Sequence, residues 1–105
     1  LDREKFVIVY LNARNAHICT DIEGEGTLTT GMVYPREILK KILRYHASAI
    51  ILAHNHPSGN PNPSKDDRNI TERLKKMCAP ISVMVHDHII LHRDGYTSFS
   101  EKGLI

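Results

Sequence analysis

The chain divides into short apolar runs and longer segments in which apolar residues recur at helical spacing. Lys5–Leu11 (KFVIVYL) is dense in β-branched and aromatic residues, and we expect a strand that is buried on both faces. A second apolar run, 48–53, leads directly into two histidines. The residues 23–26 (EGEG) indicate a flexible connection. Further strands are predicted over 17–22 (as a hairpin with the first strand), 27–33, 81–85, 88–92 and 96–100.

Two segments place apolar residues three or four positions apart, which is typical of helices that pack on one side. The first begins at Pro35, a residue that the first helical turn tolerates, and its apolar stripe comprises Ile38, Leu39, Ile42 and Leu43. The second spans 65–78 and ends before Pro80, and its apolar side comprises Ile70, Leu74, Met77 and Cys78. This order predicts the α/β class, with a mixed β-sheet flanked by helices and one helix against each face.

Composition narrows the class of protein. With 41% apolar and 25% charged residues the chain has the make-up of a soluble globular protein, and 105 residues allow one domain with its own core. The sequence has no apolar run long enough to span a bilayer and no signal-peptide pattern, so we expect no membrane association. Cys19 and Cys78 are too few for a disulfide framework, and we interpret them as buried or half-buried thiols in a reducing cytoplasm.

The charge pattern disfavours nucleic-acid binding. A net charge of +2 is mild, and the basic residues are scattered, whereas nucleic-acid binders concentrate them on one face. We interpret the basic residues of the two predicted helices as solvated helix faces; they are Lys40, Lys41, Arg44, Arg73, Lys75 and Lys76.

The most informative stretch is 54–67 (HNHPSGNPNPSKDD). In an extended backbone the side chains of residues i and i+2 point to the same face, so His54 and His56 are able to bind one ion together. Asp67, in the first turn of the predicted second helix, supplies a third ligand of oxygen type. Three protein ligands with one open position are typical of a catalytic rather than a structural zinc site.

Each part of this stretch also has an ordinary explanation. A single His-x-His is common and is weak evidence for a metal. The pattern Ser64-x-x-Asp67 is a capping box, which stabilises a helix start without any ion. The loop rich in proline, glycine and asparagine suits any strand-to-helix connection. The combination favours a metal site, and Ser64 and Asp67 are able to serve the helix cap and the site together.

The same residues resemble the JAMM motif of the JAB/MPN metalloprotease superfamily. In that motif His-x-His-Pro is followed by a serine after seven residues and by an aspartate three positions later; Ser64 and Asp67 are in register, and Asp66 is not. The hexapeptide 54–59 (HNHPSG) is similar to the RadC branch of the superfamily. The similarity to RadC continues at 3–6, 26–28, 33–37, 67–71 and 87–90.

The resemblance implies a JAB/MPN fold, a cytidine-deaminase-like α/β sandwich, with one Zn²⁺ held by His54, His56 and Asp67. We expect residues 1–105 to form a single domain. Because the chain begins at Leu1 and RadC proteins often carry a helical region before this domain, we also expect it to be the C-terminal part of a longer protein.

The resemblance further implies a catalytic glutamate upstream of the histidines, which takes a proton from water and passes it to the leaving amine. The candidates are Glu4, Glu23, Glu25 and Glu37. We favour Glu4, which directly precedes a buried strand and matches the RadC pattern Arg-Glu-x-Phe; its alternative is an exposed charge. For Ser64 the resemblance implies a role in stabilising the oxyanion, and helix capping alone is the alternative.

We therefore expect a zinc-dependent metallohydrolase, a JAMM-type metallopeptidase that cleaves an amide bond in a peptide or protein. One alternative is a nucleic-acid-binding module associated with DNA repair, which the mild charge and the aromatic content of 6% disfavour. The other is a non-catalytic scaffold for protein interactions, which the complete ligand set disfavours.

The sequence contains a second His-x-His pair, His86 and His88, with no acidic residue at a useful spacing after it. His88 either orients a metal ligand from behind or is an ordinary packed or exposed residue, and the sequence leaves these alternatives open. No pattern assigns chemistry to His17, His46 or His92.

Overall fold

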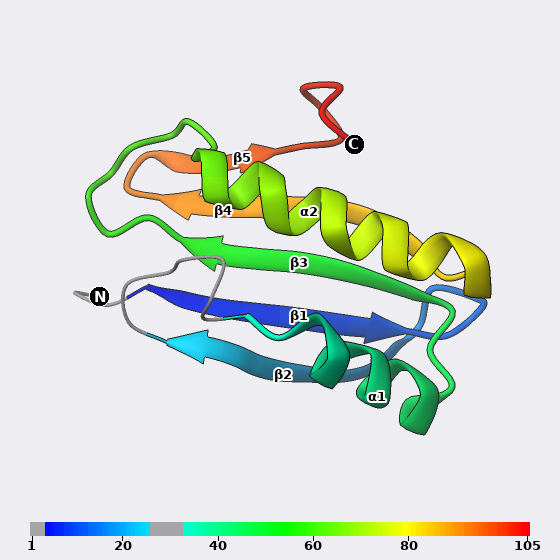
Figure 1. Ribbon diagram of the computed structural model, residues 1–105. Helices are drawn as coiled ribbons and strands as arrows, with labels where there is room; N and C mark the ends of the chain where they lie inside the picture. The colour runs from blue at the N-terminus through cyan, green and yellow to red at the C-terminus, as the bar shows by residue number, and fades with distance from the viewer. Residues whose placement is uncertain (1–3, 26–32) are drawn as a thin grey trace.

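The computed structural model describes residues 4–25 and 33–105 (Figure 1). These residues form one five-stranded sheet in the order β2-β1-β3-β4-β5. The β3–β4 pair is parallel and the other pairs are antiparallel, so the sheet is mixed, as predicted. The strands are β1 (Lys5–Leu11), β2 (His17–Glu25), β3 (Ala49–Asn55), β4 (Met84–His92) and β5 (Gly95–Ser98).

Two α-helices and one 3₁₀ turn connect these strands. Helix α1 (Pro35–Tyr45) has proline in its first turn and ends at His46, which adopts a left-handed conformation with φ of 54°. Helix α2 (Lys65–Cys78) begins with a capping box and continues into the 3₁₀ helix η2 (Ala79–Ile81). Within the described residues, neither helix has the length and apolar character needed to cross a membrane.

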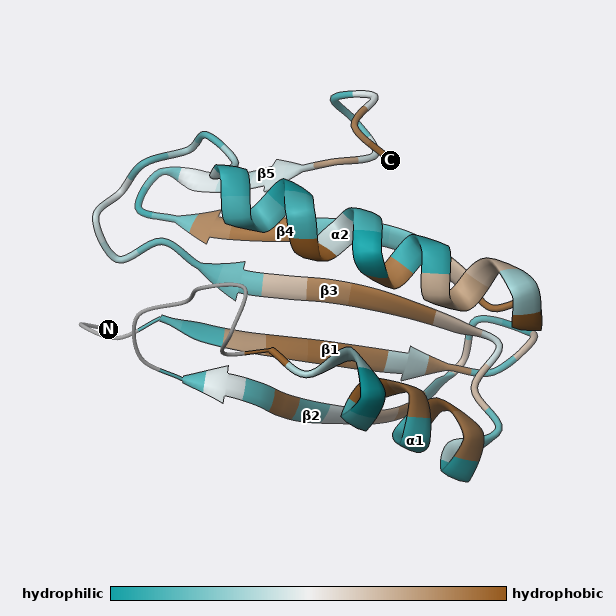
Figure 2. Cartoon of the chain, viewed as in Figure 1, coloured by the Kyte–Doolittle hydropathy of each residue, from teal (hydrophilic) through white to brown (hydrophobic). Residues whose placement is uncertain are grey.

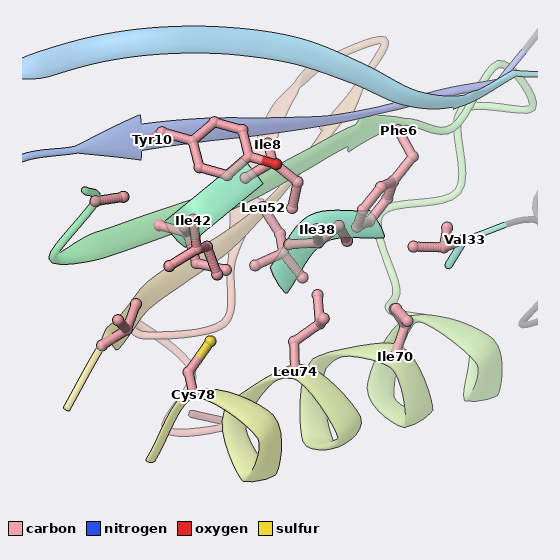
Figure 3. Packing of buried hydrophobic residues seen from close by; sticks show 13 residues of the cluster. Phe6, Ile8, Tyr10, Val33, Ile38, Ile42, Leu52, Ile70, Leu74 and Cys78 are labelled. Carbon is pink, nitrogen blue, oxygen red and sulfur yellow. The ribbon is translucent and has the colours of Figure 1, made fainter. Parts of the chain in front are cut away.

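Both helices pack on the same face of the sheet, which corrects the expectation of one helix against each face. Helices α1 and α2 contact one another, and the buried cluster joins Ile38 and Ile42 of α1 with Ile70 and Leu74 of α2. Figure 3 shows these side chains pointing toward Phe6 and its neighbours on β1 and β3. The core is therefore a single layer between the sheet and the helix pair.

The opposite face of the sheet carries no helix among the described residues. On β1, Phe6 and Tyr10 are fully buried beneath the helices, whereas Val7 and Val9 are only half-buried. The prediction that β1 is buried on both faces is therefore wrong for this face. The middle of β1 and of β3 is nonetheless coloured as hydrophobic in Figure 2, whereas the end of β3 is hydrophilic.

Two local predictions also need correction, and a third falls almost entirely outside the described residues. Residues 23–25 continue β2 along β1 rather than forming a flexible connection, because this edge strand needs pairing on one side only. The two strands predicted over 81–85 and 88–92 join in one strand, β4, which begins only at Met84 and has a bulge at His86. Ile81, the first residue of the predicted strand, belongs to the 3₁₀ helix η2. The strand predicted over 27–33 lies outside the described residues except for Val33, which is buried but not in a strand.

Candidate metal centre

Three potential ligands meet where β3 ends and α2 begins. His54 lies near the end of β3, His56 follows the strand, and Asp67 is in the first turn of α2. The Nε2 atoms of the two histidines are 2.9 Å apart. The oxygens of Asp67 lie 2.9 Å from His54 Nε2 and 3.2 Å from His56 Nε2. These buried groups together are capable of holding a metal ion.

Strand geometry places the histidines. His54 lies directly opposite Phe6 of β1 on the helix-covered face, with the two ring centroids 6.1 Å apart. His56 stays close to the sheet because its backbone N–H donates to the carbonyl of Leu91 on β4 at 2.8 Å. Residues two apart in an extended segment share a face, so both rings project toward the start of α2.

The capping box of α2 places the carboxylate. The Ser64 hydroxyl accepts a hydrogen bond from the Asp67 N–H at 3.0 Å, and Asp67 Oδ2 accepts one from the Ser64 N–H at 2.7 Å. The reciprocal bonds turn the Asp67 side chain back toward the end of β3. The cap and the candidate site therefore use the same two residues, and the sequence alternatives are compatible.

The outward nitrogen of each histidine already has a partner. His56 Nδ1 lies 2.8 Å from the carbonyl oxygen of Asn60, which only accepts hydrogen bonds, so this nitrogen carries the proton. His54 Nδ1 lies 2.8 Å from Nε2 of His88. Both remaining nitrogens, together with the two oxygens of Asp67, face one point. Nitrogens and oxygens so close together repel one another unless a proton or a metal cation lies between them.

Electrostatics favours an ionised Asp67 at this point. Burial by itself raises the pKa of a carboxyl group, but contact with His54 and the hydrogen bonds with Ser64 outweigh it and hold the pKa of Asp67 well below its usual value. Burial also lowers the pKa of His88 to about 3, so this ring is neutral at physiological pH. The centre therefore combines two imidazoles with one ionised carboxylate, the donor set of many catalytic zinc sites.

The two residues predicted to be catalytic, Glu4 and Ser64, lie next to the elements that carry the candidate ligands. Glu4 is half-buried and directly precedes β1. Lys5 N–H donates to Asn55 Oδ1 at 2.7 Å, which joins the start of β1, next to Glu4, to the end of β3, next to His56. Ser64 is exposed immediately before α2, and its side chain caps that helix.

Sequence reasoning missed Thr71 and left His88 undecided. His88 is fully buried on β4, its Nε2 lies against His54, and its Nδ1 lies 2.7 Å from the Thr71 hydroxyl. The only local signal was the spacing of Thr71 four residues after Asp67, which places both on one side of α2. The contact of His88 with His54 joins residues 34 apart in the sequence, and no local pattern encodes it.

Comparison with known proteins identifies relatives over the entire chain. A UPF0758 protein from Symbiobacterium thermophilum is 49% identical over 105 residues, which is all of this chain and 45% of that protein. UPF0758 proteins from Leptothrix cholodnii and Nitrosospira multiformis are each 46% identical, and the matches cover 47% and 46% of their lengths. The chain thus spans about half the length of these curated relatives. Their names state no activity.

The family comparison is equally extensive. Residues 1–104 match the RadC-like JAB domain, in agreement with the mixed sheet, its two helices and the metal-binding geometry of His54, His56 and Asp67. This chain belongs to the RadC-like JAB domain family.

Proposed function

We propose that the protein is a zinc-dependent hydrolase of the JAMM type, a metallopeptidase that cleaves an amide bond in a peptide or protein. The observation that carries this proposal is the convergence of His54 Nε2, His56 Nε2 and the Asp67 carboxylate on one point, while both Nδ1 atoms are engaged outward. Two imidazoles and one carboxylate suit zinc better than calcium or magnesium, which prefer oxygen ligands throughout.

Zinc, when bound, would supply an activated water molecule and polarise the scissile carbonyl. The proposed role of Glu4 is to take a proton from the attacking water and deliver it to the leaving amine. The position of Glu4 supports this role because the residue adjoins β1, whose pairing with β3 fixes it relative to His54 and His56. A carboxylate held by a rigid strand is suited to repeated proton transfer at one position.

The proposed role of Ser64 is to stabilise the oxyanion. Its oxygen accepts the Asp67 N–H, which leaves the hydroxyl proton available to donate to a substrate oxygen. The exposure of Ser64 supports this role, because a cap residue enclosed by protein would be unable to reach a substrate.

The proposal is tested by elemental analysis followed by cleavage of a peptide library with and without a chelator. We expect one zinc per chain, cleavage products in the library, and loss of cleavage after chelation that added zinc restores. Asp67→Ala should lose both zinc and cleavage, whereas Asp66→Ala is the matched control because its carboxylate is outside the centre. Stoichiometric zinc without cleavage of any peptide would contradict the peptidase assignment, and absence of zinc would contradict the site.

A further inference from the structure

A buried chain of hydrogen bonds runs from α2 through β4 to the rear of His54. The Thr71 hydroxyl donates to the carbonyl oxygen of Asp67 at 2.7 Å. His88 Nδ1 lies 2.7 Å from that hydroxyl, and His88 Nε2 lies 2.8 Å from His54 Nδ1. Thr71 and His88 are 2% and 0% exposed, so water does not compete for these bonds.

The positions of the protons in this series of hydrogen bonds follow from the Thr71 hydroxyl, at one end of the series. A hydroxyl has a single proton, and Thr71 gives it to a carbonyl that is only able to accept. The Thr71 oxygen therefore accepts the Nδ1–H of His88, which leaves His88 Nε2 as the nitrogen that faces His54 Nδ1 at 2.8 Å. When His88 Nε2 accepts a hydrogen bond from His54 Nδ1, a His54 ring with one proton has its lone pair on Nε2, the atom that faces Asp67.

Aromatic contacts hold the His88 ring in the plane that its hydrogen bonds with Thr71 and His54 require. Phe99 stacks on it with centroids 4.6 Å apart and an interplanar angle of 22°. Phe6 meets it edge-on at 5.9 Å and 88°. A ring packed on both sides is unable to rotate away from His54 without disturbing the core.

We propose that His88, oriented by Thr71, is a positioning residue that keeps the proton of His54 on Nδ1 and thereby presents Nε2 as the metal ligand. This inference rests on the proposed metal site but is separable from the proposed peptidase activity. Groups that hold the far nitrogen of a ligating histidine fix its tautomer and orientation, and their loss commonly weakens metal affinity 10- to 100-fold.

Two substitutions of His88 distinguish positioning from packing. The side-chain oxygen in His88→Gln is able to occupy the place of Nε2 and accept the His54 proton, whereas His88→Phe keeps a stacked ring but offers no acceptor. We expect zinc affinity, measured by chelator competition, to fall about 10- to 100-fold in His88→Phe. In His88→Gln we expect most of that affinity to be retained. A purely structural role predicts the reverse order, because phenylalanine preserves the ring packing better.

Nitrogen-15 NMR of the imidazole rings tests the tautomer directly, and it needs no metal. In the metal-free protein, at a pH where the rings are neutral, we expect His54 to be protonated on Nδ1, and a mixture of tautomers in His88→Phe. Thr71→Val provides a second, milder variant in case His88→Phe does not fold. Tyr10→Phe is the matched control, because it removes a hydroxyl hydrogen bond, to Glu23, at another place in the protein.

Several results would overturn the inference. The first is an unchanged His54 tautomer in both His88→Phe and Thr71→Val. The second is a zinc affinity in those variants within twofold of that of the parent protein. The third is a loss of zinc affinity in Tyr10→Phe that equals the loss in those variants. Absence of zinc binding in the parent protein would instead contradict the proposed function. In that case the NMR comparison alone decides whether the hydrogen bonds from Thr71 through His88 set the His54 tautomer.

Discussion

Two polar clusters lie beneath the helices on the same face of the sheet, and they differ in how donors and acceptors are matched. One is the candidate metal centre at the end of β3, formed by His54, His56 and Asp67, which we call the metal centre. The other, which we call the tyrosine–lysine cluster, joins β1, β2 and α1 and consists of Tyr10, Asp21, Glu23, Lys41 and Tyr45.

In the tyrosine–lysine cluster the donors meet the acceptors. Tyr10 donates to Glu23 at 3.0 Å and Tyr45 to Asp21 at 2.9 Å. Lys41 Nζ lies 2.9 Å from Glu23 and 3.4 Å from Asp21, so it is not the solvated helix-face residue predicted from the sequence. This cluster is complete without any further ion or ligand.

In the metal centre, by contrast, acceptors face one another. The Nε2 atoms of His54 and His56 and the oxygens of Asp67 lie about one hydrogen-bond length apart, with their other nitrogens engaged elsewhere. The comparison teaches that burial of polar groups does not by itself indicate a functional site. An excess of acceptors that converge on one point does indicate a functional site, because it creates a place for a cation.

The largest expected effect is loss of metal on removal of a ligand. His56→Ala and Asp67→Ala should abolish stoichiometric zinc binding, since each removes one of three protein ligands. Lys41→Met in the other cluster should leave zinc binding unchanged. Elemental analysis of dialysed protein measures both. Retention of a full equivalent of zinc by Asp67→Ala would show that the acceptors converge for another reason.

The next effect separates chemistry from binding. Glu4→Gln should keep one zinc per chain and lose roughly 10²- to 10⁴-fold in turnover, because the amide is unable to accept the proton. Glu37→Gln is the matched control, since Glu37 is on the surface of α1 and pairs only with exposed Lys40 among the described contacts. Steady-state rates on the same peptide measure the difference. Full activity of Glu4→Gln would exclude Glu4 as the base.

A smaller effect is expected from breaking the matched cluster. Lys41→Met leaves the carboxylates of Asp21 and Glu23 without their shared cation, and we expect a loss of about 1–2 kcal/mol in the free energy of unfolding. Lys40→Met, which breaks an exposed pair with Glu37, should cost well under 1 kcal/mol. Urea denaturation of metal-free proteins measures both. Equal costs would mean that the cluster is no better matched than a surface pair.

The smallest effect is on a tyrosine titration. The hydrogen bond to Asp21 raises the pKa of Tyr45 to about 12, because ionisation would place a phenolate against a carboxylate. Asp21→Asn should therefore lower the pKa of Tyr45 toward the ordinary value of about 10. Ultraviolet absorbance during alkaline titration, with Tyr45→Phe used to identify its contribution, measures this shift. A pKa that did not fall would place the cause outside Asp21.

Elements with strong local signals could be predicted from the sequence. Strand β1 has the predicted bounds because Lys5–Leu11 is uniformly strand-forming, and α2 has the predicted bounds because a capping box opens it and Pro80 closes it. Features that depend on pairing between distant segments could not be predicted from the sequence. The bulge at His86 hides the continuity of β4, and no local signal tells which face of the sheet a helix will cover.

The same distinction applies to the metal centre. His54, His56 and Asp67 could be predicted because all three lie within the short stretch 54–67, which joins the end of β3 to the start of α2. The hydrogen-bond partners that fix the protons of His54 and His56 could not be predicted, because Asn60 acts through its backbone and His88 comes from another strand. The sequence thus encodes the ligands locally, whereas their orientation depends on the folded sheet.

The most direct test of the central claim is a crystal structure of the protein soaked in zinc, with anomalous data collected at the zinc edge. We predict a single anomalous peak bonded to His54 Nε2, His56 Nε2 and Asp67, at distances of about 2.0–2.2 Å that are usual for such ligands. A peak at other residues, or no peak while the three side chains keep their present arrangement, would contradict the account.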